Sequence, residues 1–189
     1  MKIRFLQVLA AVAAVLFVSQ PAAAGECDTR DALFRAAEES GVRLNYEQTV
    51  TASSEHVSFA GTSIAGFEQV SASQLRDGAD AGFIYLDAPR SGIPAGFYRL
   101  HAQAPEPRLG THKGTVNLVS REGKVVAQVP ASMETWSMEV PRPLPFERTL
   151  MDTHVRNEPS TGGGSEARIK IIITIHCPNG TTITIIFDL

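Results

Sequence analysis

The chain has 189 residues, 43% of them hydrophobic, and a formal net charge of −3 at pH 7. This length favours a single domain that can bury an adequate hydrophobic core. The acidic balance argues against a nucleic-acid-binding protein, which needs a basic surface.

Residues 1–24 have the pattern of a cleaved signal peptide. Lys2 and Arg4 supply the positive start, an apolar stretch covers 5–18, and three alanines precede the predicted cleavage point. The apolar stretch is shorter than the roughly 20 residues of a membrane-spanning helix. A retained N-terminal anchor is one alternative. A lipoprotein modified at Cys27 is another, but the acidic residue directly before this cysteine argues against it. We therefore expect an exported protein, periplasmic or extracellular, with a leader typical of bacteria.

After cleavage, residues 25–189 would form one domain with no transmembrane segment and only two cysteines, Cys27 and Cys177. An even number of cysteines in an exported chain predicts a disulfide. The bridge would close a loop of about 150 residues, which stabilises the fold by roughly 5 kcal/mol in the chain-entropy model. A redox or metal-binding pair is the alternative, but the C-x-x-C spacing is absent.

One helix is expected, at residues 29–40, before a series of strands. Asp28 is a candidate N-cap, and Gly41 follows the last helical position. Leu33, Phe34 and Ala37 form a narrow apolar stripe that could lie on a sheet.

The rest of the chain alternates between apolar and polar residues in short runs separated by turn signals. Strands are predicted at 42–47, 56–60, 64–71, 82–87, 97–103, 115–121, 124–129, 133–140 and 146–155. Loops are predicted at 76–80 and 89–96, an extended proline-rich segment at 141–145, and a flexible Gly-rich connection at 156–165. This spacing favours an all-β fold, a single antiparallel β-sandwich with one short N-terminal helix.

The middle hairpin can be assigned a register. A two-residue loop of Glu122 and Gly123 pairs Val116 with Val129 and places apolar residues on one face.

The C-terminal hairpin, residues 167–187, gives the clearest pattern in the chain. A three-residue loop at 178–180 pairs Cys177 with Thr181 and separates a core face from a polar face. The core face then carries Ile171, Ile173, Ile175, Cys177, Thr181, Ile183, Ile185 and Phe187.

Residues 93–100 read Ile-Pro-Ala-Gly-Phe-Tyr-Arg-Leu. Their P-x-G-x-Y pattern resembles the start of a strand in prealbumin-like sandwiches. The resemblance covers eight residues and implies a fold class, with no functional residue.

Candidate functional side chains lie on the polar faces of the predicted strands. The candidate surface consists of Arg99, His101, Asp152, His154 and His176. His154 could act as a base and Asp152 as the carboxylate that orients it, but no sequence motif indicates a nucleophile. Three methionines, Met133, Met138 and Met151, with His154 suggest a copper site, although methionine more often packs in cores.

These patterns predict a non-catalytic binding or structural module of the cell envelope or exterior, without a cofactor. Its partner would be an unknown protein or a carbohydrate. An exported hydrolase and a periplasmic copper carrier are the alternatives. Tyr85, Tyr98 and Trp136 could form a sugar-binding platform if exposed, although core packing is their more common use.

Overall fold

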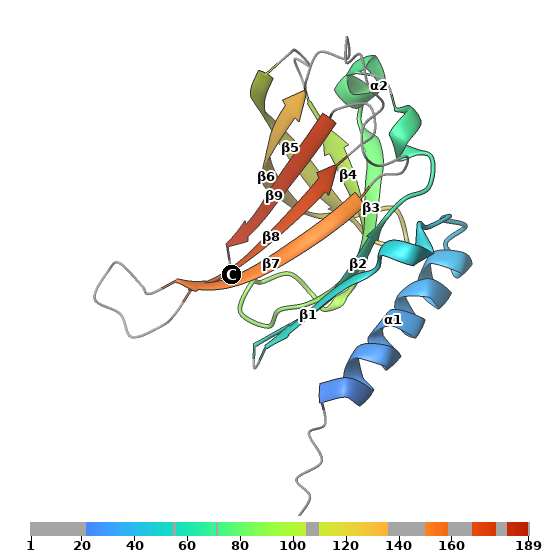
Figure 1. The fold of residues 1–189 in the computed structure, drawn as a ribbon, viewed down its shortest axis with the longest axis vertical. Helices are drawn as coiled ribbons and strands as arrows, with labels where there is room; N and C mark the ends of the chain where they lie inside the picture. The colour runs from blue at the N-terminus through green and yellow to red at the C-terminus, as the bar shows by residue number, and fades with distance from the viewer. Residues whose placement is uncertain are drawn as a thin grey trace, which may run out of the picture.

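The structure is a computed structural model that describes residues 22–54, 56–70, 72–104, 110–135, 150–158, 168–176 and 181–188. These residues form two α-helices, two short 3-10 helices and nine strands (Figure 1). The helices are α1 (Ala22–Glu39), α2 (Ala72–Asp77), η1 (Tyr46–Gln48) and η2 (Phe67–Gln69). The strands are β1 (Val50–Ser54), β2 (Val57–Ser63), β3 (Ala79–Asp87), β4 (Gly96–Gln103), β5 (Gly110–Val119), β6 (Val125–Thr135), β7 (Leu150–Glu158), β8 (Arg168–His176) and β9 (Thr181–Asp188).

All nine strands belong to one antiparallel sheet, in the order β1-β2-β3-β4-β5-β6-β9-β8-β7. The sheet curls until its two edges, β1 and β7, have Cα atoms within 8 Å of each other (Figure 1). No ladder joins these edges, so the barrel is nearly closed. The predicted all-β character is therefore correct, whereas the predicted sandwich of two sheets is not found. Both folds alternate inward and outward residues, so the pattern alone could not separate them.

Glycines on the inner face let the sheet bend. Gly61 in β2 and Gly82 in β3 are buried and lack the Cβ that would stiffen and fill the wall. Met151, from β7, fills this space: its Sδ and Cε lie 3.3 Å and 2.7 Å from the Cβ positions of Gly61 and Gly82. Gly61 was expected to separate two strands, but it lies inside β2. Met151 therefore packs one edge strand of the sheet against β2 and β3, near the other edge.

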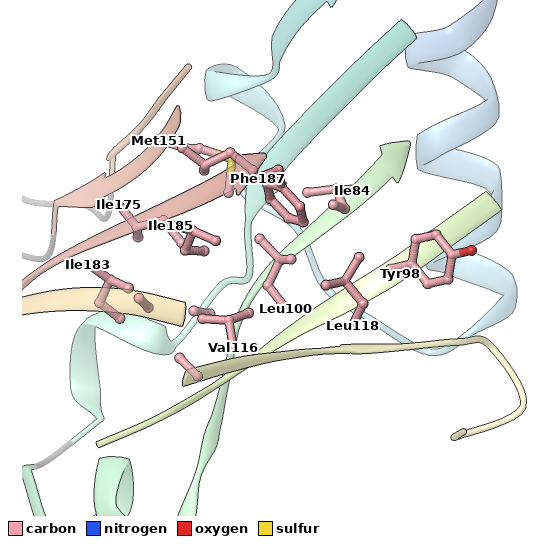
Figure 2. Close-up of a cluster of buried hydrophobic side chains, with 14 of the residues drawn as sticks. Ile84, Tyr98, Leu100, Val116, Leu118, Met151, Ile175, Ile183, Ile185 and Phe187 are labelled. Carbon is pink, nitrogen blue, oxygen red and sulfur yellow. The ribbon is translucent and has the colours of Figure 1, made fainter. Parts of the chain in front are cut away.

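The interior is filled by apolar side chains (Figure 2). The C-terminal hairpin contributes six residues that are at most 1% exposed, Ile171, Ile173, Ile175, Ile183, Ile185 and Phe187. β8 and β9 pair from Lys170 with Asp188 to His176 with Thr182, which confirms the predicted register. The loop at 178–180 lies outside the described residues.

α1 covers the outer face of the sheet and forms a second, smaller core. Leu33 and Ala37 are fully buried there against Phe83 and Leu44. The helix begins at Ala22, earlier than predicted, so Asp28 is an internal position and not the N-cap. The alanines at 22–24 explain this, since alanine has the highest helix propensity. Cleavage of the predicted signal peptide remains a prediction.

The predicted disulfide also remains a prediction, because the side chain of Cys27 and all of Cys177 lie outside the described residues. A disulfide needs Cα atoms less than about 7 Å apart. The mass of the unreduced protein would settle the question.

The segment between α1 and β3 differs most from the prediction. The strand expected at 42–47 is wrong: Leu44 makes an isolated bridge to Ile64, and η1 follows. The strand expected at 64–71 is replaced by a turn and η2, while β1 and α2 were not anticipated. The apolar residues of 42–47 were read as one face of a strand. Instead, Val42 and Leu44 pack against α1.

The middle hairpin has the predicted register but a different loop. Val116 pairs with Val129, as expected, yet the register shifts by one residue between Leu118 and Val119. Gly123 has φ +79°, and its N–H donates to the Ser120 carbonyl at 3.0 Å. The loop therefore has three residues, because glycine supplies the left-handed conformation that this turn needs.

Two later boundaries also differ. β6 continues to Thr135, so residues 133–135 extend the middle hairpin and do not begin a separate strand. β7 runs to Glu158, three residues into the predicted flexible connection. Residues 136–149 and 159–167 lie outside the described part of the chain.

None of the described helices is long and apolar enough to cross a membrane.

The P-x-G-x-Y pattern does mark the start of a strand. β4 begins at Gly96, and the hydroxyl of the buried Tyr98 donates to the Pro94 carbonyl. The sandwich that the resemblance implied is not found.

Candidate functional site

A cluster of three charged or polar side chains lies on the outer face of β3 and β4. Arg99 donates from Nη1 to Asp80 Oδ2 at 2.8 Å, and His101 Nδ1 lies 2.8 Å from Asp80 Oδ1. Each of the three side chains is about one-third exposed. The single carboxylate of Asp80 thus orients both side chains of β4.

A β-bulge brings Asp80 to this face. Asp80 pairs with His101 and Gly82 pairs with Leu100, so Ala81 is the extra residue. Without the bulge, Asp80 would share the inner face of Gly82, because strand side chains alternate. The irregularity therefore turns a carboxylate outward beside Arg99 and His101.

Gly78 connects α2 to β3 and supports the imidazole of His101. Its φ is +102°, a conformation that glycine adopts without strain. His101 Nε2 occupies the place where a Cβ of residue 78 would lie, so any side chain there would displace the ring. The Gly78 N–H also donates to the Gln74 carbonyl at 3.0 Å. The ring is thus held between Asp80 and the end of α2.

The cluster borders a surface depression of about 520 Å³. Its lining consists of Gly78, Ala79, Asp80, Arg99, His101, Asn117, Val119, Gly123 and Val125. Asn117, on β5, is opposite His101, and its Oδ1 accepts a 2.9 Å hydrogen bond from Gln128 Nε2. That bond directs the amide N–H₂ group of Asn117 away from Gln128. The lining therefore combines polar side chains with the apolar Val119 and Val125.

This arrangement is suited to binding. The Asp80–His101 pair has the geometry of an oriented base, but the described lining residues include no hydroxyl or thiol that could act as a nucleophile. Arg99 and Asn117 supply hydrogen-bond donors, and Asp80 supplies acceptors. Strands hold these groups, and sites built on strands are more precise than those on loops.

The other candidate residues lie elsewhere on the sheet, in two separate contacts. Asp152 Oδ2 and His154 Nε2 are 3.2 Å apart on the exposed face of β7. His176 Nδ1 lies 3.3 Å from Thr182 Oγ1, across the β8–β9 pair. Four strands separate β4 from β7 in the sheet, so the five predicted residues do not form one site.

The two described methionines, Met133 and Met151, pack in the core. Met133 and Met151 are at most 5% exposed, whereas His154 lies on the outer face, so the two thioethers and this imidazole do not converge. Met138 lies outside the described residues. His112 is buried opposite Met133, and its Nε2 has no hydrogen-bond partner in the described part. Within that part, no three His, Cys, Asp or Glu side chains are grouped to hold a metal ion.

Of the two described tyrosines considered for a sugar platform, Tyr98 packs inside the protein and Tyr85 is half-buried. Tyr98 is buried in the barrel, and burial raises the pKa of its hydroxyl. Tyr85 packs against Phe97 with ring centroids 5.2 Å apart, beside the core under α1. Burial, and then the charge of Asp87, raise the pKa of Tyr85. Trp136 lies outside the described residues.

One carboxylate near the rim of the depression has a lowered pKa. Glu122, in the β5–β6 loop, accepts a 2.7 Å hydrogen bond from the Ser120 hydroxyl. This bond is the main reason that the pKa of Glu122 is lowered, with a smaller effect from the neighbouring cations. The folded loop therefore favours the charged form of Glu122.

A second depression, of about 200 Å³, lies between the β1–β2 connection and the loop after β3. Its polar lining includes His56, Asp87 and Arg90. No ion pair joins these three side chains, so the depression beside Asp80 is the better organised of the two.

Asp80 and Asn117 are the site residues that sequence reasoning missed. Asp80 was assigned to a loop at 76–80, and Asn117 was only a polar position in the middle hairpin. The alternating pattern does place Asn117 on the polar face of a predicted strand. The local sequence does not tell which strand lies next to it in the sheet, so its position beside His101 could not be predicted.

The chain matches no protein-family model, no curated protein and no solved structure. The function must therefore be argued from the site itself.

Proposed function

We propose that the protein is an exported, non-catalytic binding module of the cell envelope or exterior. The depression bordered by Asp80, Arg99, His101 and Asn117 is its ligand-binding site. The observation that carries this proposal is the convergence of four polar side chains from three adjacent strands, with short hydrogen bonds orienting each one.

The location of the site supports binding on the outer face of the barrel. The interior is filled by apolar side chains such as Leu100, Leu118 and Phe187, each at most 1% exposed (Figure 2). A ligand would have to unfold this core to enter it. The outer depression already exists and needs no rearrangement, which lowers the entropic cost of binding.

The missing nucleophile supports binding over covalent catalysis. A His–Asp pair becomes catalytic when the histidine activates a hydroxyl, a thiol or a water next to a bound substrate. Here the ring of His101 is held between Asp80 and Gly78, and the part of the lining that the structure describes contributes neither hydroxyl nor thiol.

Nuclear magnetic resonance of ¹⁵N-labelled protein tests the binding site. We would titrate the full chain with a panel of small anions, cations, neutral sugars and short peptides. The expected result is that at least one class shifts the resonances of Arg99, Asn117 and their neighbours and is not chemically converted. The Arg99→Gln variant should lose these shifts, while Arg90→Gln, a matched change at the other depression, should keep them.

Two results would contradict the proposal. The first is that every compound that binds shifts residues elsewhere on the protein. The second is that a compound bound at the depression is turned over.

Export is tested by expressing the chain with its own leader in a bacterial host and measuring the N-terminus of the product. We expect a chain that starts after residue 24, outside the cytoplasm. A full-length chain in the cytoplasm would contradict it.

A further inference from the structure

We infer that the ligand of this depression carries a carboxylate attached to a small aliphatic group. This inference rests on the proposed function and specifies the ligand class. It follows from the hydrogen-bond donors that line the depression, from the charge around them, and from the apolar residues of the lining.

The donors of Arg99 and Asn117 are positioned but only partly used. Asp80 accepts from one of the five N–H groups of the guanidinium. Asn117 accepts from Gln128 through its oxygen, and the N–H₂ group of its amide is left for a ligand. Arg99 and Asn117 are diagonal neighbours on β4 and β5, since Arg99 pairs with Val119 and His101 pairs with Asn117. Diagonal side chains of this length can reach the same group.

A planar carboxylate suits this pair of donors. Its two oxygens can accept from guanidinium and amide N–H groups together, and guanidinium binds carboxylates with matching geometry. The neighbouring residues keep both donors in place before the ligand arrives, because Asp80 fixes Arg99 and Gln128 fixes Asn117. The orientation of the donors is thus already set.

The charge of the cluster favours one negative charge over two. The charges of Asp80 and Arg99 balance each other. A phosphate dianion would place its second charge close to the carboxylate of Asp80, which repels it. A single carboxylate can stay on the Arg99 side and leave Asp80 with its present partners.

Two valines make part of the lining apolar. Val119 is 9% exposed and Val125 is 59% exposed, so Val125 presents most of this surface to solvent. An aliphatic group next to the carboxylate would cover it. Removing this apolar surface from water favours binding.

Isobutyrate is the probe, and isobutyramide is its uncharged counterpart of the same shape. Titration of the full-length ¹⁵N,¹³C-labelled protein with isobutyrate should shift the Arg99 side-chain N–H, the Asn117 amide and the Val125 methyl signals. Isobutyramide should bind at least about tenfold more weakly, since hydrogen bonds to a charged carboxylate are stronger than those to a neutral amide. Acetate should also bind more weakly and leave the Val125 methyl signals unchanged.

Variants locate the binding. Arg99→Gln should weaken isobutyrate binding about tenfold or more, and Arg90→Gln should leave it unchanged. Valine and inorganic phosphate are two further arms: valine tests whether the carboxylate may come from an amino acid, and phosphate should fail to bind.

The outcomes separate this inference from the proposed function. Equal binding of isobutyrate and isobutyramide, or preferred binding of phosphate, a cation or a sugar at the depression, would overturn the carboxylate and keep the binding site. Absence of any binding at the depression would overturn both.

Discussion

Replacing Gly82 with alanine tests how the barrel closes. Gly82 is buried on the inner face of β3, and a Cβ there would lie 2.7 Å from Met151 Cε. The next contacts are Leu100 Cδ1 at 3.2 Å and the Thr62 carbonyl oxygen at 3.3 Å. The closest clash is therefore with the end of a side chain that comes from β7, the far edge of the sheet.

Overpacking of this kind costs about 1–3 kcal/mol. In a chain of this size 1 kcal/mol lowers Tm by about 2–4 °C, so Gly82→Ala should lower Tm by roughly 2–12 °C. Met151→Val removes the clashing end but leaves a gap, and it should also destabilise the protein. In the double variant the new methyl group fills part of that gap. We expect its loss to be smaller than the sum by about 0.5–3 kcal/mol, the usual coupling of contacting residues.

The assay is chemical denaturation of the wild type, both single variants and the double variant. Gly114→Ala with Met133→Val is the control pair, because the Cβ at position 114 would also lie 2.7 Å from the Gln103 carbonyl oxygen. That clash is with backbone, so Met133→Val should rescue it less. If the Gly82 and Met151 changes add within about 0.5 kcal/mol, Met151 does not cover Gly82 and the closure described here is wrong.

Three further predictions concern register, pH and the α1 contact. Ile173→Asp should unfold or precipitate the protein, because Ile173 is fully buried, whereas Thr174→Asp on the outer face should be far milder; similar melting curves would refute the register. Ser120→Ala should raise the pKa of Glu122, measured by NMR titration, because the Ser120 hydrogen bond lowers this pKa in the wild type. The charged form of Glu122 stabilises the fold above the unfolded-state pKa. This contribution disappears as the pH falls through the folded-state pKa. An unchanged pKa would contradict this assignment. Arg121→Ala should cost less than about 1 kcal/mol, since its 2.6 Å ion pair with the last turn of α1 is exposed; a larger loss would show that this pair anchors the helix.

The C-terminal hairpin was determined by its own sequence. Alternation of isoleucine with polar residues allows one register, because a slip of one residue would turn every isoleucine to the other face. Ile173 and Ile185 accordingly meet inside the barrel. The middle hairpin followed the same rule, except at the turn. There the positive φ of Gly123 favoured a three-residue loop over the two-residue loop that the spacing suggested.

The candidate site was half predictable. Arg99 and His101 were placed correctly on one face of a strand, because period-2 alternation continues through β4. Asp80 was not, because the bulge at Ala81 breaks the alternation that would otherwise have put it inside. The extra residue of a bulge leaves no mark in the local pattern.

Only the tertiary structure decided between a sandwich and a barrel. A strand sequence specifies which side chains face inward, and it does not specify whether the opposite wall belongs to the same sheet. That choice depends on curvature, which here comes from small inward positions at Gly61 and Gly82. Their consequence becomes visible only when Met151, about 70 to 90 residues away in the chain, packs over both glycines. Contacts between such distant residues are set by the packing of the whole sheet, so the local sequence determines the strands and their faces, and the tertiary structure determines the closure.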